Sequence, residues 1–425
     1  MLTKVSLFSS KRDFLLASFA ILFIATYSLL MEFNNYKRLT QFDSSLVTAT
    51  LQKQYEKTKL AKSGKIKKYQ VLKLKSDDDF VFYTTSKKRV NAHVGQKIEL
   101  EIWAGDISFY EYMTGFYAFS KVLHLSLDLS AKNSLNVMIA HEHQDKNSTS
   151  VYQALYTAKP LERDIQNKFS SLGVSHLVAI SGFHLSVLSA LLFFLLKHPY
   201  KFLQNRYFPY RSHKVDSFII IAVILLSYLL FLDSPPSLLR AFVMLVIGFI
   251  LYDRGMELIS TQTLFLSVIL LLALFPRLLF SLGFWLSVAG VFYIFLFLLY
   301  YKGLSKVWQF VLVPFWVYVL MIPYSIIIFG NFSVYHPLSI VWTSLFSVFY
   351  PLSIFLHLIG FGDSLDVFLK LLINLDTNAT KIALDAKWLA FYVILSLLAV
   401  WKKIFLLFTL LNALSIFIYA VYQIT

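Results

Sequence analysis

The chain has 425 residues, of which 57% are hydrophobic, 17% aromatic and only 15% charged. An average globular domain carries roughly a quarter charged residues, so this composition excludes an ordinary soluble protein and predicts a polytopic membrane protein. The absence of cysteine excludes disulfides and thiolate metal sites, and membrane orientation accounts for only part of the formal net charge of +15.

The first apolar run covers residues 14–31 and follows Lys4, Lys11 and Arg12. No small-x-small cleavage site follows the run, so residues 1–35 are interpreted as an uncleaved membrane helix and not as a signal peptide. Basic residues ahead of a first span favour an N-terminus in the cytoplasm.

Residues 36–110 have a different, strongly cationic composition. Apolar and charged residues alternate at 72–75 and at 98–102, which is the period of a half-buried strand. The pattern predicts a small β domain of about OB-fold size, outside the cytoplasm. One interpretation is that its lysines bind along a polyanion while aromatic side chains serve as stacking platforms. The other is that the lysines form a solvated face and the aromatic side chains form the core. The cationic candidates are Lys73, Lys75, Lys87, Lys88 and Arg89, and the aromatic candidates are Tyr69, Phe80, Phe82, Tyr83 and Trp103.

Residues 111–173 are mixed in composition and are predicted to form amphipathic connecting helices. After Pro160, a suitable first helical residue, apolar residues recur at helical spacing. They are Leu161, Ile165, Phe169 and Leu172. Such a helix would lie on the membrane or against the bundle.

A possible metal site lies within this connecting segment. His141, His143 and Asp145 resemble the start of a metallo-β-lactamase metal site, but Lys146 stands where that motif has its final histidine. The Lys146 ammonium would then lie beside a divalent metal ion, which would repel it. The fold also needs further ligands, and only about thirty residues remain before the first bundle span. A metal site is therefore disfavoured, and residues 141–150 are interpreted as a polar loop.

Residues 174–425 are dominated by apolar segments. Together with the first span they predict about nine or ten membrane segments, some of them broken or re-entrant because Pro and Gly interrupt them. The candidate spans are 175–196, 216–232, 237–252, 260–275, 278–300, 307–329, 337–358, 386–401 and 404–421.

The lysines and arginines between spans predict the orientation of the chain. The loop 197–214 carries five of them and is expected in the cytoplasm, which places the β domain outside. Lys302 and Lys402 are both expected inside, and this requires one later segment not to cross. The segment 323–351 is the best candidate because four residues can break its helix, namely Pro323, Gly330, Pro337 and Pro351.

Three polar constellations lie within apolar segments, and each permits a functional and a packing interpretation. The path-lining candidates are His176, Ser181, Gly182, His184, Ser237, Arg240, Gly283 and Ser287. Small residues can let helices approach closely, and polar ones can hydrogen-bond between helices. Arg240 sits near the expected outer end of its span, where it either snorkels or contacts a phosphate.

An intramembrane serine hydrolase is a weaker interpretation of residues 179–182. Those enzymes have Gly where this chain has Ala179, and Ser181 and His184 share one predicted helix. The sequence also has no phosphate-binding loop for ATP. No catalytic residue, metal or cofactor is therefore expected.

The three constellations, in this order, resemble the competence domain of the ComEC family, the inner-membrane DNA channel of natural transformation. The matching stretches are 173–188, 235–244, 283–290 and 337–354. The resemblance implies a multi-pass protein of the cytoplasmic membrane that passes single-stranded DNA into the cell. The resemblance also implies partners: membrane lipid, an external DNA receptor, and a cytoplasmic helicase-like ATPase or single-strand-binding proteins. It leaves open whether further copies of the chain are partners too.

Longer members of that family carry a C-terminal metallo-β-lactamase-like domain. No such sequence precedes Thr425, so a short form is expected. The alternative function is small-solute transport, which internal repeats would favour, and none is evident in the sequence.

Overall fold

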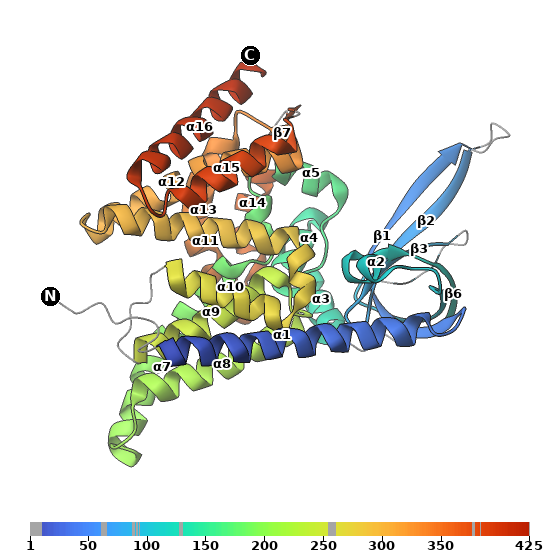
Figure 1. The fold of residues 1–425 in the computed structure, drawn as a ribbon, viewed down its shortest axis with the longest axis horizontal. Coiled ribbons are helices and arrows are strands. Elements are labelled where there is room, and N and C mark those ends of the chain that lie inside the picture. Colours follow the sequence, from blue (N-terminus) through green and yellow to red (C-terminus); the bar gives the residue numbers. More distant parts are fainter. Residues whose placement is uncertain are drawn as a thin grey trace.

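The computed structural model describes residues 11–60, 66–86, 90, 92, 94–126, 131–253, 261–375, 379–382 and 384–424. It contains a long first helix, a six-stranded sheet and a large helical body. Figure 1 shows the sheet standing beside the helical body, with α1 running along the body and reaching the sheet.

The elements before the helical body form the sheet and its neighbours. They are α1 (Lys11–Thr40), β1 (Ser45–Leu60), β2 (Ile66–Ser76), β3 (Val81–Ser86), β4 (Lys97–Trp103), α2 (Phe109–Thr114), β5 (Phe116–Tyr117) and β6 (Phe119–Leu125).

The helical body follows in chain order. It holds α3 (Ala131–Glu142), α4 (Lys146–Thr157), α5 (Arg163–Ser171), α6 (Ser175–Val178), α7 (Gly182–Tyr207), α8 (His213–Phe231), α9 (Pro236–Asp253), α10 (Thr261–Leu274), η1 (Pro276–Phe280), α11 (Leu282–Tyr301), α12 (Lys306–Phe329), β7 (Asn331–Phe332), η2 (His336–Leu338), α13 (Ser339–Leu358), η3 (Gly362–Leu365), α14 (Asp366–Ile373), β8 (Thr380–Lys381), α15 (Ala386–Leu398) and α16 (Lys403–Tyr422).

The sheet has the strand order β5-β3-β2-β1-β4-β6. Its two outer strands, β5 and β6, are separated only by Ala118, so the ends of the sheet meet. Strand β6 also contacts β3, because the hydroxyls of Thr84 in β3 and Ser120 in β6 form a 2.7 Å hydrogen bond. The sheet therefore closes on itself, and because β6 pairs with β4 it extends beyond the predicted boundary at residue 110.

The core of the closed sheet confirms the alternation read from the sequence. The predicted inward residues are buried: Leu72, Leu74, Ile98, Leu100 and Ile102. Phe80 and Phe82 are buried in the same cluster, so these two aromatic candidates cannot be surface stacking platforms. The alternation works here because each strand has one face toward an apolar interior.

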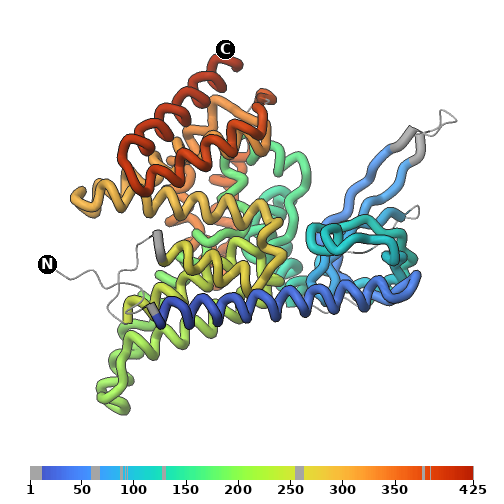
Figure 2. Tube along the Cα trace, viewed as in Figure 1, coloured from blue at the N-terminus to red at the C-terminus, as the bar shows by residue number. Residues whose placement is uncertain are grey.

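Strands β1 and β2 continue beyond the closed sheet as a two-stranded ribbon, which is called the β1–β2 arm here and comprises residues 57–60 and 66–69. Figure 2 shows this pair of strands projecting from the rest of the molecule. The arm is antiparallel, and a register shift between Leu51 and Lys53 separates it from the part of β1 that pairs with β4.

Within the described residues, eight helices are long and apolar enough to cross a membrane. They are α1, α7, α8, α9, α11, α12, η2–α13 and α16, and the apolar helices α10 and α15 are shorter. The prediction of a mostly helical protein with several segments that could span a membrane is confirmed. The predicted span 175–196 is interrupted: α6 ends at Val178, and α7 begins at Gly182 after the extended residue Ser181.

Within the segment 323–351, the helix breaks at only two of the four predicted positions. Helix α12 continues through Pro323 and ends at Gly330, whose φ of 67° is the left-handed conformation that glycine favours. Pro351 lies inside α13 without ending it. Gly330 and Pro337 are therefore at the break, and the expectation that Pro323 and Pro351 also break helices was wrong.

Helix α13 and the connecting helices contact one another at several points. His336 Nε2 lies 3.0 Å from the backbone oxygen of Ser170 at the end of α5. Near the other end of α13, His357 Nε2 lies 3.1 Å from His143 Nε2 in the α3–α4 turn. Both ends of α13 therefore contact the α3–α6 region, and the expectation that one late segment does not cross remains a prediction.

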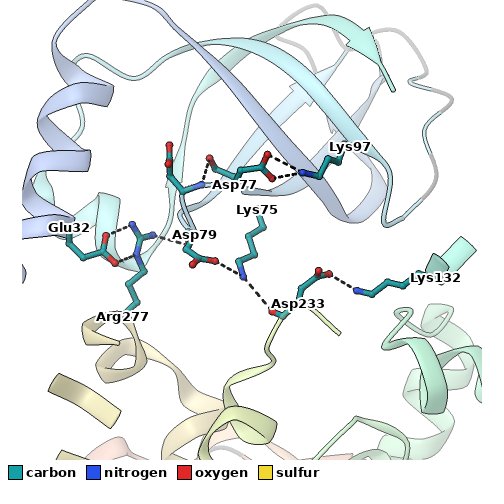
Figure 3. Close-up of polar contacts among 10 residues, drawn as sticks. Glu32, Lys75, Asp77, Asp79, Lys97, Lys132, Asp233 and Arg277 are labelled. Atoms are coloured by element: carbon teal, nitrogen blue, oxygen red, sulfur yellow. Dashed lines mark hydrogen bonds and ion pairs between the residues drawn. The ribbon is translucent and has the colours of Figure 1, made fainter. Parts of the chain in front are cut away.

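Charged contacts fix the sheet against the helical body, as Figure 3 shows. Arg277 of η1 donates two hydrogen bonds, of 2.8 and 2.6 Å, to the carboxylate of Glu32 in α1. It also donates to the backbone oxygen of Asp79 before β3, and its guanidinium lies 4.5 Å from the ring centroid of Tyr112 in α2. One arginine therefore joins α1, the β2–β3 turn, α2 and the α10–α11 connection.

A second set of contacts involves the turn between α8 and α9. Lys75 Nζ pairs with Asp79 at 2.7 Å and donates to the backbone oxygen of Asp233, while Lys132 pairs with the Asp233 carboxylate (Figure 3). The sheet, the α8–α9 turn and the α10–α11 connection therefore lie at the same end of the helical body.

Replacing Glu32 with Gln should lower the free energy of unfolding by about 2 kcal/mol, because Arg277 then keeps its charge without its half-buried carboxylate partner. The control is Asp77→Asn, which breaks the pair with Lys97, whose side chains are 52% and 55% exposed. Such an exposed pair is worth about 0–1 kcal/mol. Thermal unfolding in detergent measures both, and equal shifts in melting temperature would contradict the proposed difference.

Candidate functional site at the contact between α7 and α9

The first turns of α7 and α9 pack closely because Gly182 has no side chain. A Cβ built on Gly182 would lie 2.9 Å from the Cβ of Ala241 and 3.1 Å from Nη2 of Arg240. Ser237 strengthens the contact by donating a 3.1 Å hydrogen bond to the backbone oxygen of Ile180. The structure thus brings together two constellations that lie more than fifty residues apart in the sequence.

Arg240 is a buried cation at this contact. It is only 5% exposed, and its Nη1 lies 3.0 Å from the thioether sulfur of Met244, a weak acceptor. Its Nε has no hydrogen-bond partner, and among the described residues no carboxylate forms an ion pair with it. A buried unpaired charge costs several kcal/mol, so a bound anion would stabilise this side chain.

His184 is the second buried polar group of the site, with 0% exposure. Its Nδ1 accepts a hydrogen bond from the backbone N–H of Ser181, at 3.2 Å, and lies 3.1 Å from the Ser181 hydroxyl. This arrangement caps the start of α7 and leaves the ring proton on Nε2, which is buried without a partner. The site therefore presents a second unsatisfied donor.

The ring of His184 is held by aromatic side chains of α13. Its centroid lies 4.7 Å from that of Tyr350 and 5.3 Å from that of Phe346, both edge-on. This packing fixes the imidazole. A base also needs a free lone pair, and the Ser181 N–H already occupies the one on Nδ1. The geometry therefore suits anion binding at two helix N-termini better than proton abstraction from Ser181.

The other path-lining candidates lie apart from this contact or play a different role. His176 is exposed on α6 and lies 3.3 Å from the hydroxyl of Thr343 in α13. Gly283 and Ser287 lie on α11. A Cβ built on Gly283 would meet no atom within 4 Å, so the packing interpretation of this glycine was wrong.

The cationic candidates of the sheet have mixed outcomes. Lys75 is engaged with Asp79 and Asp233, so it serves the docking of the sheet. Lys73 points out of the sheet and forms no ion pair with a described carboxylate. Lys87, Lys88 and Arg89 lie outside the described residues.

The interpretation of residues 141–150 as a polar loop was wrong. Helix α3 runs to Glu142, and α4 begins at Lys146 because Asp145 caps it by accepting a 2.8 Å hydrogen bond from the backbone of Ser148. The pattern Asp-x-x-Ser was the available signal. In the described part of the chain, no group of three or more His, Asp or Glu side chains is arranged to hold a metal ion.

His143 belongs instead to a buried cluster that sequence reasoning did not find. Its Nδ1 lies 2.9 Å from Asp366 Oδ1 and its ring stacks on Tyr152, with the centroids 4.4 Å apart. With His357 the cluster links the α3–α4 turn to α13 and α14. His357 and Asp366 are more than two hundred residues away from His143 in the sequence, so no local pattern could have indicated them.

The chain was compared with known proteins. The profile of a family described as "Competence protein" matches residues 157–422. No curated protein and no solved structure matches the chain closely enough for comparison.

Gly182→Ala should destabilise the protein by about 1–3 kcal/mol, because the added methyl group overlaps Ala241 and the Arg240 guanidinium. Gly283→Ala is the matched control, since open space surrounds that position and alanine favours a helix by up to about 1 kcal/mol. Melting temperatures in detergent should fall for the first variant only. A loss of equal size in both would contradict the close contact at Gly182.

Proposed function

The chain belongs to the competence protein family, and from this premise we propose that it is a channel that passes single-stranded DNA across the cytoplasmic membrane during natural transformation. The observation that supports this proposal most is Arg240, a buried guanidinium without a described carboxylate partner, next to two helix N-termini. Competence concerns DNA uptake, and DNA carries one phosphate charge per nucleotide.

The chemistry of Arg240 matches that of a phosphate. A guanidinium donates two parallel hydrogen bonds to a phosphate and stays charged when it is buried. The N-termini of α7 and α9 add the positive ends of two helix dipoles, and the unpartnered Nε2–H of His184 adds a donor. Conduction requires that each phosphate is bound and then released, which a single cation allows more readily than a cluster.

The proposed orientation places the sheet outside the cytoplasm. The sheet shares one end of the helical body with the α8–α9 turn and the α10–α11 connection, while the basic α7–α8 loop would be cytoplasmic. The closed strand order supports the OB-like interpretation. In this arrangement an external receptor delivers DNA to the sheet, and a cytoplasmic ATPase or single-strand-binding protein draws the strand inward.

Arg240→Gln should reduce the cytoplasmic arrival of labelled DNA by about tenfold or more at equal membrane levels, because a hydrogen bond to a charged group contributes about 1.5–3 kcal/mol. DNA should then accumulate in a nuclease-sensitive form outside the membrane. Arg206→Gln, an exposed position in the last turn of α7, is the control and should leave uptake unchanged. Normal uptake by Arg240→Gln would reject the assignment of Arg240 to the DNA path.

A further inference from the structure

Two helix connections meet at the end of the helical body that lies away from the sheet (Figure 1). They are the connection between α11 and α12 and the connection between α15 and α16. The hydroxyl of Tyr300 donates a 2.7 Å hydrogen bond to the backbone oxygen of Ala399, and the ammonium of Lys403 lies 6.0 Å from the ring centroid of Tyr301. The last turn of α11 is therefore fastened to the segment that leads into α16.

Four lysines surround these two connections, and together they are named the cationic end. They are Lys302, Lys306, Lys402 and Lys403. All four are exposed, and no described carboxylate forms an ion pair with any of the last three. The neighbouring helices add no opposite charge, because the sequence has no Asp or Glu at 258–362 or at 386–425. Like charges gathered in this way repel one another, so a bound anion would stabilise them.

Large apolar side chains lie among the lysines of the cationic end and are more than half exposed. They are Val307, Trp308, Phe310 and Trp401. Helices α12 and α16, which begin here, are long and apolar enough to cross a membrane. Tryptophan is enriched at the level of the lipid headgroups, where its ring meets hydrocarbon and its N–H meets water. The composition of this end therefore fits the boundary between acyl chains and headgroups.

Membrane orientation explains a basic residue in each connection but not the assembly of both. The positive-inside rule counts lysines and arginines in a loop, and it does not require two loops to be joined. Here Tyr300 and Lys403 join them. A nucleic acid would match the lysines alone, since it has no use for exposed Val307 and Phe310. A phospholipid with a negative headgroup matches both the charged and the apolar side chains.

We propose that the cationic end is a binding site for an anionic phospholipid. Its headgroup phosphate contacts the lysines, and its acyl chains cover the exposed tryptophans and their apolar neighbours. The bound lipid joins the α11–α12 hairpin to the α15–α16 hairpin by neutralising charges that otherwise repel. The proposal stands apart from the proposed function, because Arg240 lies in the first turns of α9 and α9 follows the turn that contacts the sheet.

The experiment follows thermal unfolding of the full chain in a non-ionic detergent while phospholipid is added. Phosphatidylglycerol should raise the melting temperature to a plateau, because a ligand that binds only the folded state stabilises it. Phosphatidylcholine has the same chains without net charge and should give a much smaller rise. Glycerol 3-phosphate carries the phosphate without the chains and should give none.

The charge component is tested by Lys302→Gln and by Lys403→Gln. Each should raise the phosphatidylglycerol concentration for half-maximal effect about fivefold, the factor expected for one lysine near an anionic surface. The matched control is Lys387→Gln, an exposed position at the other end of α15 whose ammonium lies 4.0 Å from Asp385, and it should change nothing. Lys403→Arg keeps the charge and should bind as the unchanged protein does, which separates lost charge from lost folding.

The apolar component is tested by Trp401→Ala against Trp388→Ala. Both rings are more than half exposed, and Trp388 lies at the start of α15, away from the cationic end. Trp401→Ala should weaken the response to phosphatidylglycerol, because the acyl chains lose the surface that they cover. Trp388→Ala should leave the response unchanged.

Four results would overturn the lipid site. The first is an equal rise in melting temperature with phosphatidylcholine, and the second is an equal rise with glycerol 3-phosphate. The third is that each control variant weakens the response as much as its partner at the cationic end. The fourth is displacement of phosphatidylglycerol by oligo(dT), which would assign these lysines to nucleic acid.

Discussion

The position of the sheet depends on the ion pair between Glu32 and Arg277. Helix α1 contacts the body mainly along the apolar helix α10, and lipid could replace such apolar contacts at little cost because hydrocarbon chains are equally apolar. Lipid cannot replace the ion pair between Glu32 and Arg277, in which two hydrogen bonds join side chains that are each 17% exposed. Because Arg277 also binds the backbone of Asp79 and the ring of Tyr112, the pair fixes α1 and the sheet against the same turn of the body.

Features with a local physical cause could be predicted from the sequence, and features made by distant partners could not. The alternation at 72–75 and 98–102 follows from strands with one buried face, and the break at Gly330 follows from glycine's backbone freedom. The closing contact of Thr84 with Ser120 and the burial of His143 against Asp366 join segments that no local pattern relates. The loop predicted at residues 141–150 was wrong for a local reason, since Asp145 caps α4 and starts a helix within this polar stretch.

The candidate site was predicted in composition but not in arrangement. Polar residues in apolar segments indicated Ser181, Gly182, His184 and Arg240, whereas only the structure reveals that Gly182 lets the Arg240 guanidinium approach α7. The structure also separates two roles that the sequence left mixed. Ser181 and His184 form a helix cap, and this cap uses the lone pair that a catalytic base would need. Arg240 remains as the buried charge without a described carboxylate partner in that constellation.

The proposed path has cations of two kinds, and physical chemistry gives them different tasks. Charges at the protein surface act through water and salt, where screening reduces their attraction over about 8–10 Å. An exposed lysine of the sheet, such as Lys57, would therefore attract a phosphate only weakly. Arg240 lies in an apolar contact, where the attraction of a phosphate is much stronger. In the proposed path, several such buried cations in a row would trap a polyanion, whereas a single buried cation would bind a phosphate and still permit its release.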